Sequence, residues 1–322
     1  MKIAILDDYA RAALRLADWS EAAAQAEIVA FDRHLTPEEM PDALASFEVI
    51  CTVRERSTIP AGTLSRLPKL RLITVTDSRV RSVDFAAAAA RGVVVSEARP
   101  PGETPPPSHA AAEFTWGLLL ALVRHIPAEA ASLRAGHWQS SLGLSLAGRT
   151  LGLVGFGRIG RRMARYAAAF GMDVLAWSQN LSAADAEAGG ARLVEKRELF
   201  GASDIVSVHY LLSARSRGIV GRSDIAAMKP SAYLINTSRG PLVDEDALVA
   251  ALREKAIAGA ALDVFNQEPL PKDHPLLALD NVVLTPHLGF VTEDAMRRFY
   301  QGMAFAVAAY LRGEPVNLLP AT

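Results

Sequence analysis

The sequence predicts an α/β protein with two doubly wound domains, each a parallel sheet with helices on both faces. Short apolar runs alternate with Ala-rich helical patterns along most of the chain, which is typical of this class. A proline-rich segment, residues 99–108, interrupts the alternation once. The chain has 322 residues, more than one ordinary hydrophobic core organises. Together these observations favour two domains joined through the proline-rich segment.

The first alternating series predicts five buried strands, because each apolar run is short and rich in Ile, Val or Leu. The helical patterns between them include residues 9–26 and 83–91. The second of these ends at Gly92, a favourable residue for a helix C-cap. The strands are expected at residues 2–6, 27–31, 49–53, 72–75 and 93–95.

The second series begins with a long helix, expected at residues 109–125, and ends with a helix at 293–311. We expect the last helix to return to the first domain. This predicts one domain from residues 1–103 plus 291–322, and another from residues 104–290. The strands of the second domain are expected at residues 150–154, 174–177, 205–209, 232–235, 259–262 and 282–284.

Composition narrows the classes of partner and site. The 34 Lys and Arg residues balance 35 Asp and Glu residues, so no general field attracts nucleic acid or an acidic membrane. The single cysteine, Cys51, lies in an apolar run and predicts a buried, inert thiol. Neither a signal peptide nor a transmembrane segment is expected, and no zinc motif is present, which favours a cytoplasmic protein without a metal site.

The segment from Gly155 to Gly160 matches the pattern G-x-G-x-x-G between a predicted strand and a helix expected at residues 158–170. Gly155 permits the tight turn, Gly157 lets the backbone approach a pyrophosphate, and Gly160 allows close packing of helix and strand. The first helical residues, Arg158 and Ile159, then offer backbone N–H groups to the phosphates. The pattern predicts a dinucleotide site for NAD or NADP in a Rossmann domain.

The residue expected to read the adenosine ribose leaves the choice of dinucleotide open. An acidic residue at the end of the next strand favours NAD by holding the 2′-hydroxyl. Here that position holds Ser178, and no Arg or Lys follows directly to grip a 2′-phosphate.

Three further segments follow strands of the second series, where doubly wound folds place their chemistry. They are residues 236–240 (Asn-Thr-Ser-Arg-Gly), 261–269 (ending Gln-Glu-Pro) and 284–289 (Leu-Thr-Pro-His-Leu-Gly). Behind the glycine turn, these motifs resemble the D-isomer-specific 2-hydroxyacid dehydrogenase family, which includes phosphoglycerate, glycerate and hydroxypyruvate/glyoxylate-type enzymes. The resemblance is dense from about residue 111 to 318. It implies an NAD(P)-dependent oxidoreductase that interconverts a small 2-oxo acid and its D-2-hydroxy acid.

The same resemblance implies a flavodoxin-like substrate domain, an active site in a cleft between the domains, and a homodimer. Residue by residue, Arg239 would bind the substrate carboxylate and carbonyl, and His287 would be the acid/base. Glu268 would pair with that histidine, and Asp263 would contact the nicotinamide carboxamide. The remaining residues expected to bind the cofactor are Thr237, Ser238 and Gly289, together with the glycine turn and Ser178.

Elementary chemistry agrees with these implied roles. Hydride arriving at a carbonyl carbon builds negative charge on oxygen, which a guanidinium stabilises. A proton is then delivered near neutral pH, which suits histidine, and an adjacent carboxylate stabilises the protonated imidazole. Reduction needs His287 protonated and oxidation needs it neutral, so the two directions should prefer opposite ends of the pH range.

The first domain departs from the family pattern where substrate identity is decided. Asp77 stands where a glycine is usual, and its carboxylate would repel a substrate carboxylate unless Arg79 neutralises it. The loop from residue 97 to 108 is also longer and richer in proline than the pattern suggests. The residues expected to bind substrate are Arg54, Ser78, Arg79 and Arg239, with a solvated charge cluster as the alternative for Arg54.

These departures keep two alternatives open. The first is a nicotinamide-sensing, co-repressor-like protein on the same fold, although such a sensor needs no acid/base pair of the kind formed by Glu268 and His287. The second is formate or phosphite oxidation, which Glu268 disfavours because the formate enzymes that this chain resembles pair the histidine with glutamine. Among the other histidines, His109 would face substrate or the solvent, and His209 would either contact the cofactor or serve the structure.

Overall fold

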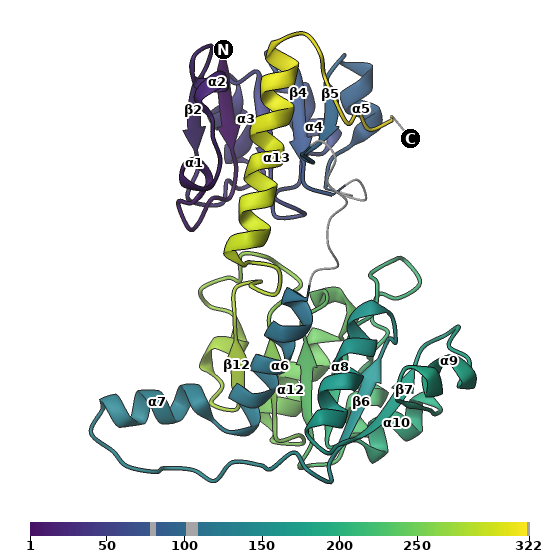
Figure 1. The fold of residues 1–322 in the computed structure, drawn as a ribbon. Coiled ribbons are helices and arrows are strands. Elements are labelled where there is room, and N and C mark those ends of the chain that lie inside the picture. The colour runs from purple at the N-terminus through teal and green to yellow at the C-terminus, as the bar shows by residue number, and fades with distance from the viewer. Residues whose placement is uncertain (78–81, 101–108, 321–322) are drawn as a thin grey trace. The chain divides into compact units, whose positions relative to one another are not determined.

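A computed structural model describes residues 1–77, 82–100 and 109–320 (Figure 1). The chain divides into two compact units, each described below by itself. Unit 1 consists of Met1–Pro106 and Val291–Thr322, and unit 2 of Pro107–Phe290. The expected boundaries were 103/104 and 290/291. Most of the predicted proline-rich hinge, and the predicted substrate residues Ser78 and Arg79, lie outside the described residues.

Unit 1 contains a five-stranded parallel sheet in the order β2-β1-β3-β4-β5. This is the strand order of flavodoxin-like domains, as expected. Strands β3 and β4 are buried along their whole length, because a parallel sheet is covered on both faces. The strands are β1 (Lys2–Ile5), β2 (Glu27–Ala30), β3 (Val49–Thr52), β4 (Leu72–Val75) and β5 (Val94–Glu97).

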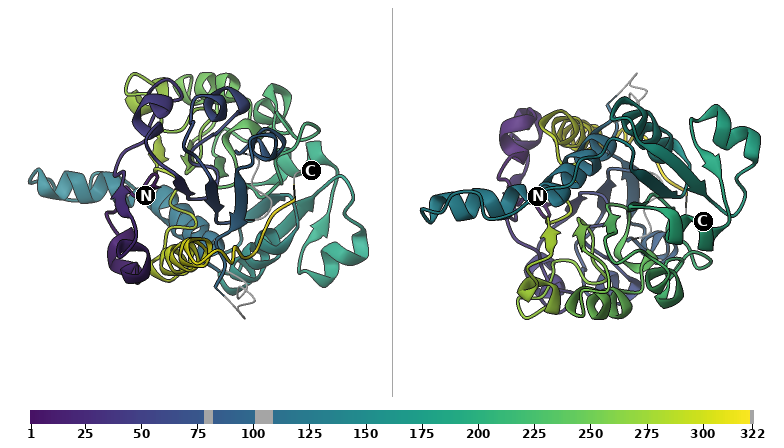
Figure 2. Two further views of the ribbon diagram at one scale, coloured as in Figure 1. Left: turned by 90° about the horizontal axis from the view of Figure 1, so that it is seen from above. Right: turned by 90° about the horizontal axis from the view of Figure 1, so that it is seen from below.

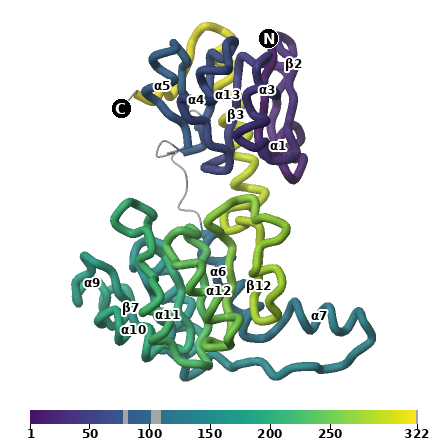
Figure 3. The backbone as a smooth tube through the Cα atoms, turned by 180° about the vertical axis from the view of Figure 1, so that it is seen from behind, coloured from purple at the N-terminus to yellow at the C-terminus, as the bar shows by residue number. Residues whose placement is uncertain are grey.

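Helices cover both faces of this sheet. Helix α13 (Glu293–Leu311) lies across one face in Figure 1, where it contacts α1, α2, β4 and β5. Helices α3 and α4 lie on the opposite face, which Figure 3 shows from behind. The return of the last helix to the first unit is as the sequence predicted. The other helices are α1 (Ala13–Leu16), α2 (Ser20–Ala23), α3 (Glu39–Leu44), α4 (Ala61–Ser65) and α5 (Phe85–Ala90).

The single helix predicted over residues 9–26 was wrong, since two short helices occupy that stretch. Asp8 accepts hydrogen bonds from the N–H groups of Ala12 and Ala13, so α1 begins only at Ala13. The backbone then becomes extended at Ala17. The indole N–H of Trp19 donates to the carbonyl of Ala13 over 3.0 Å. Such side-chain to backbone bonds compete with helix continuation.

Helix α13 is tied into unit 1 by two close contacts. The hydroxyl of Tyr300 donates to Asp8 over 2.9 Å, and both residues are buried. Burial raises the pKa of Tyr300, and the neighbouring Asp8 carboxylate raises it further, so the phenol remains a donor. Gly302 packs closely against the segment that follows β5. A Cβ on Gly302 would stand 2.3 Å from the carbonyl oxygen of Ala98.

Unit 2 contains a seven-stranded parallel sheet in the order β12-β11-β10-β9-β6-β7-β8. From β8 to β11 this is the Rossmann order 3-2-1-4-5-6, with β12 as an additional edge strand. The predicted α/β doubly wound class is confirmed. The strands are β6 (Thr150–Val154), β7 (Asp173–Trp177), β8 (Arg192–Leu193), β9 (Ile205–Val208), β10 (Tyr233–Asn236), β11 (Gly259–Leu262) and β12 (Val282–Leu284).

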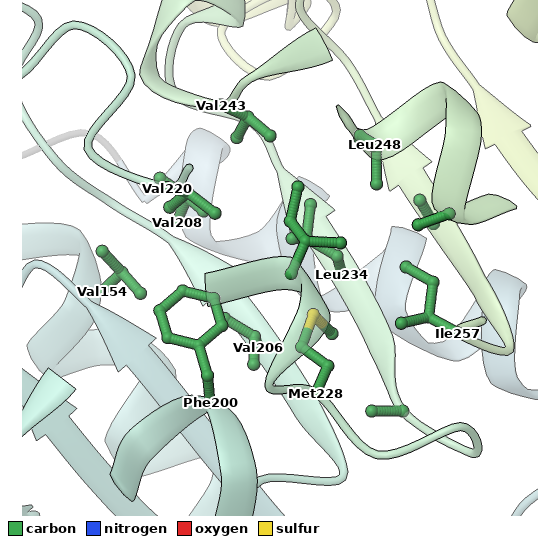
Figure 4. Close-up of a cluster of buried hydrophobic side chains, with 14 of the residues drawn as sticks. Val154, Phe200, Val206, Val208, Val220, Met228, Leu234, Val243, Leu248 and Ile257 are labelled. Atoms are coloured by element: carbon green, nitrogen blue, oxygen red, sulfur yellow. The ribbon is translucent and has the colours of Figure 1, made fainter. Parts of the chain in front are cut away.

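Successive residues of each strand point to opposite faces of this sheet, and an apolar layer packs on each face. On one face Val154, Val206 and Leu234 pack with Phe200 and Leu248, a cluster drawn in Figure 4. On the other face neighbouring strand residues pack against α6 and α8. The helices are α6 (Ala110–Val123), α7 (Ile126–Arg134), α8 (Arg158–Ala169), α9 (Ala183–Ala188), α10 (Lys196–Ala202), α11 (Arg222–Ala226) and α12 (Glu245–Arg253).

Helix α7 and the chain after it project from the rest of unit 2, as both views of Figure 2 show. None of the residues of α7 is buried. Several large apolar side chains of this arm, residues 126–142, are exposed: Ile126, Leu133, Trp138 and Leu142. In the part of the chain that the structure describes, no helix has the length and apolar character needed to cross a membrane.

We predict opposite changes in stability when alanine replaces two helical glycines, Gly302 and Gly117. Replacing glycine by alanine within a helix ordinarily stabilises a protein by up to about 1 kcal/mol. For Gly302→Ala we expect destabilisation by about 1–3 kcal/mol instead, because the added Cβ meets a backbone carbonyl. Gly117→Ala in α6 is the control, since a Cβ there meets nothing within 4 Å. Thermal unfolding of both variants tests this, and an equal or higher melting temperature for Gly302→Ala would contradict it.

Candidate active site

The glycine turn lies at the carboxyl end of β6, where the strand order of unit 2 reverses between β7 and β9. Gly155 has φ +95°, a conformation that glycine adopts without strain. A Cβ on Gly155 would also come within 2.5 Å of the carbonyl oxygen of His209, which follows β9. A Cβ on Gly160 would come equally close, 2.5 Å, to the carbonyl oxygen of Gly155. The turn therefore needs glycine at both positions.

The turn also fits a dinucleotide phosphate. Gly157 is the N-cap of α8, and its side-chain position opens onto space with no atom within 4 Å. The N-cap residue Gly157 has no side chain that could cap this helix, so it leaves the first N–H groups, including those of Arg158 and Ile159, without a cap from that position. The first turn contains no acidic residue. An anion is the natural acceptor for such a helix end.

Ser178 follows β7, the strand beside β6. The aromatic rings of Trp177 and Tyr210 stack there with centroids 6.2 Å apart. The hydroxyl of Tyr210 accepts a hydrogen bond from the N–H of Gln179 over 3.3 Å, which braces the loop after Ser178 against the segment after β9.

The turn after β10 presents Arg239. Buried Asn236 holds this turn through its amide, which donates to the carbonyl of Arg239 and accepts from the N–H of Ser238. The hydroxyl of Ser238 donates to the carbonyl of Tyr210 after β9. The guanidinium of Arg239 donates to the carbonyl of Ser238 over 2.7 Å. The turn is thus fixed to the neighbouring strand before any ligand binds.

The next residue, Gly240, brings this turn against the segment after β11. A Cβ on Gly240 would lie 2.1 Å from the carbonyl carbon of Phe265, so only glycine permits the approach. The N–H of Phe265 in turn donates to Oε1 of Glu268 over 2.9 Å. The charge of Arg239 acts on Glu268 and lowers the pKa of its carboxyl group. The turn that carries Arg239 therefore lies against the segment that carries Glu268.

Glu268 pairs with His287, as predicted. The Nδ1 atom of His287 lies 2.6 Å from Oε2 of Glu268, with both side chains partly exposed. Burial raises the pKa of Glu268. The hydrogen bond and charge of His287 and the N–H of Phe265 lower it, and the net pKa is below its usual value. Glu268 is thus ionised at neutral pH. The rings of Phe290 and His287 pack in a T-shaped pair, with centroids 5.5 Å apart.

Asp263 holds the segment that carries His287. Its carboxylate accepts hydrogen bonds from the Thr285 hydroxyl and from the N–H groups of Leu288 and Gly289, over 2.6–2.8 Å. Burial raises the pKa of Asp263 above its usual value, although these three bonds oppose the shift. Asp263 is 0% exposed, so its visible role is structural, and its predicted contact with a carboxamide stays a prediction.

Two contacts near the site were not predicted. The hydroxyl of Thr237 lies 2.7 Å from that of Thr115 on α6, which connects the Arg239 turn to a helix far away in sequence. His209 shares a hydrogen bond of 2.9 Å with the hydroxyl of Ser207, and burial lowers the pKa of His209 to about 4. This histidine is neutral and engaged within the unit. No sequence pattern signals either contact. The contact of Thr115 with Thr237 joins two elements that are far apart in sequence, and the contact of Ser207 with His209 lies within one strand end.

In unit 1, the predicted substrate residue Arg54 lies beside Asp77, with Nη1 and Oδ2 3.8 Å apart. Arg54 has φ +54°, and its N–H donates to the hydroxyl of Thr76. The sequence suggested Arg79 as the residue that neutralises Asp77, and the described structure places Arg54 there. Among the described residues, no group of three or more His, Cys, Asp or Glu side chains could hold a metal ion.

Comparisons with known proteins agree with this geometry. Residues 116–289 match the family model described as D-isomer specific 2-hydroxyacid dehydrogenase, NAD binding domain. The chain is 39% identical over 283 residues to D-3-phosphoglycerate dehydrogenase of Methanocaldococcus jannaschii, which covers 87% of this chain and 53% of that protein. It is 38% identical over 271 residues to glyoxylate reductase of Aeropyrum pernix, covering 81% of this chain and 79% of that protein. The chain thus spans about half the length of the phosphoglycerate dehydrogenase relative.

Solved structures show the same fold. Phosphoglycerate oxidoreductase from Vibrio cholerae superposes with a TM-score of 0.88 at 36% identity, covering 97% of this chain and 99% of that one. The apo structure of D-lactate dehydrogenase from Escherichia coli gives a TM-score of 0.78 at 26% identity, covering 99% and 100%.

The buried Asp263 carboxylate yields a prediction that does not depend on activity. In Asp263→Asn, an amide N–H₂ must replace one oxygen that now accepts a backbone N–H. Two N–H donors then face each other away from water, and neither has an acceptor. We expect hydrogen exchange at Leu288 and Gly289 to speed up at least tenfold, which corresponds to about 1.4 kcal/mol or more of lost protection. Asp280→Asn is the control, because Asp280 is exposed and pairs only loosely with Lys255. Unchanged exchange in Asp263→Asn would rule out this holding role.

Proposed function

Because this chain belongs to the D-isomer-specific 2-hydroxyacid dehydrogenase family, we propose that it transfers hydride between NAD(P)H and a small 2-oxo acid, giving the D-2-hydroxy acid. The observation that carries the proposal is the hydrogen bond of 2.6 Å between His287 and Glu268, with the Arg239 turn packed against the segment of that carboxylate. Unit 2 would bind the dinucleotide, and unit 1 would contribute to substrate binding. The same side chains give no support to a sensor, which needs no acid/base pair.

The proposed dinucleotide site consists of residues from the strand ends of unit 2. Gly155, Gly157 and the first N–H groups of α8 would hold the pyrophosphate. Ser178 would lie toward the adenosine ribose, while Thr237, Ser238 and Gly289 would line the nicotinamide half. When bound, the nicotinamide supplies or accepts the hydride. The absence of an acidic residue at Ser178 is compatible with either NAD or NADP.

Arg239 and His287 would have different roles at the substrate, one in binding and charge stabilisation and the other in proton transfer. The guanidinium of Arg239 would bind the carboxylate and stabilise the negative charge that develops on the carbonyl oxygen. The contact with Glu268 occupies Nδ1 of His287, so Nδ1 keeps its proton and Nε2 is the atom that gives or takes one. In reduction Nε2 would donate a proton to the forming alkoxide, and in oxidation it would accept the hydroxyl proton. Glu268, ionised at neutral pH, would stabilise the imidazolium.

A substrate panel tests the proposed reaction. We expect turnover with at least one of glyoxylate, hydroxypyruvate, pyruvate, phenylpyruvate and 2-oxoisocaproate, each assayed with NADH and with NADPH. His287→Asn should lower kcat by about 10²–10⁴-fold without loss of dinucleotide binding, because only the proton donor is removed. Tight dinucleotide binding with no turnover of any acid would instead favour the sensor.

The pH dependence tests the assignment of His287 and Glu268. Reduction should be fast at low pH and decline as His287 loses its proton, whereas oxidation should rise over the same range. Glu268→Gln removes the charge that stabilises the imidazolium, and an amide N–H₂ replaces one of the two oxygens that now accept from His287 and Phe265. The decline of reduction should therefore move to lower pH in this variant.

The matched control is Glu245→Gln, because Glu245 also pairs with a histidine, His274, at 3.4 Å. Its pH profile should equal that of the wild type. Identical profiles for reduction and oxidation, or a Glu268→Gln profile that does not move, would contradict the assignment.

We also propose that the protein is a cytoplasmic homodimer joined through the arm of residues 126–142. Trp138 is 79% and Leu142 95% exposed, which is costly for apolar side chains unless a partner covers them. The variant with Trp138→Ser and Leu142→Ser should sediment as a monomer. Leu14→Ser on α1 is the control and should leave the dimer intact, since it changes an exposed leucine outside the arm. A double variant that sediments as a dimer would refute this role of the arm.

A further inference from the structure

Thr115, a buried residue of α6, lies beside the proposed dinucleotide site without belonging to any of its motifs. Its hydroxyl is 2.6 Å from the carbonyl oxygen of Ala111, one helical turn earlier, and 2.7 Å from the hydroxyl of Thr237. Thr115 is 0% exposed, so no solvent competes for these contacts. The hydroxyl pair therefore forms a short chain from the helix backbone to the turn that carries Arg239.

The direction of each hydrogen bond in this chain follows from the atoms involved. A carbonyl oxygen only accepts, so Thr115 must donate its single proton to Ala111. Thr115 then has only lone pairs left for Thr237, and Thr237 must be the donor between the two hydroxyls. The only hydroxyl proton of Thr237 thus points into the protein. Whatever Thr237 offers on its outer side is acceptor lone pairs alone.

Thr237 lies at the same edge of the sheet as the glycine turn, and its outer side is the side that faces away from Thr115. Thr237 is half-buried at the carboxyl end of β10, between Asn236 and the Ser238–Arg239 turn. The hydroxyl of Ser238 donates a hydrogen bond to the carbonyl of Tyr210. The carbonyl of the preceding residue, His209, packs against Gly155. These contacts connect Thr237 to the glycine turn through the segment after β9.

We propose that Thr115 is a positioning residue that fixes Thr237 as a pure hydrogen-bond acceptor for a donor group of the bound dinucleotide, an inference that rests on the proposed function. Two donors of a nicotinamide nucleotide share this chemistry, the carboxamide N–H₂ and a ribose hydroxyl. Thr115 touches neither. It acts by orienting one proton, which preorganises the site before the dinucleotide binds.

The test measures dissociation constants of NADH or NADPH by titration calorimetry, without a 2-oxo acid. Thr237→Val, which removes the acceptor, should weaken binding about threefold to tenfold, the range of one hydrogen bond. Thr115→Val should weaken it about twofold to fivefold, because the hydroxyl of Thr237 loses its fixed orientation. Thr115→Ser retains the hydroxyl and should bind like the wild type. The double Val variant should be no weaker than Thr237→Val, since Thr115 acts only through Thr237.

Thermal unfolding controls for folding, and Thr115→Ser separates the hydroxyl from packing. Titration with the analogue in which a methyl ketone replaces the carboxamide identifies the donor. If the carboxamide donates, Thr237→Val costs nothing with the analogue, and if a ribose hydroxyl donates, the loss is unchanged; both results support an acceptor role.

Three results would overturn the proposal: wild-type affinity in Thr115→Val, failure of Thr115→Ser to bind like the wild type, or independent effects of the two Val substitutions. A wild-type chain that binds neither dinucleotide would overturn the proposed function as well. A wild-type chain that binds and turns over, with Thr115→Val unchanged, would overturn only this inference.

Discussion

The contact between Nδ1 of His287 and Glu268 is the interaction on which the proposed chemistry of this molecule depends. It decides which imidazole nitrogen exchanges protons, because the nitrogen facing a carboxylate keeps its proton in both charge states. It also keeps Glu268 ionised, since the neighbouring positive charges lower the pKa of that carboxyl group below its usual value despite burial. The proposed acid/base group and its counter-charge therefore both lie within unit 2.

Much of unit 2 serves to hold this pair in place. Buried Asp263 gathers the segment around His287, and buried Asn236 gathers the turn around Arg239. Gly240 lets that turn approach the segment of Glu268 more closely than any other residue would allow. Three loops that follow three adjacent strands are thus joined by side chains that a ligand need not touch. The register of a parallel sheet brings these loops together, since the strand ends share one edge.

The sequence predicted the strands and the class of fold well, because buried parallel strands are short apolar runs and their period is local. It also placed the glycine turn, Arg239, Glu268 and His287 after predicted strands, where the structure has them, while the roles expected of these residues came from the family resemblance. It failed over residues 9–26, where Asp8 and Trp19 satisfy backbone groups that an uninterrupted helix would use. It also missed the pair of Thr115 and Thr237 and the approach of Arg54 to Asp77, because such contacts depend on how separate elements pack together.

The most direct test of the central contact is nitrogen NMR of the protein labelled with ¹⁵N-histidine, with His287→Asn used to assign the signals. We predict that the Nδ1 resonance of His287 stays that of a protonated nitrogen across the titration, while Nε2 changes from protonated to unprotonated. In Glu268→Gln the same change should occur at lower pH. A His287 ring whose Nδ1 loses its proton while Nε2 keeps one would contradict this assignment of the two nitrogens, because the nitrogen facing Glu268 would then be the one that exchanges protons.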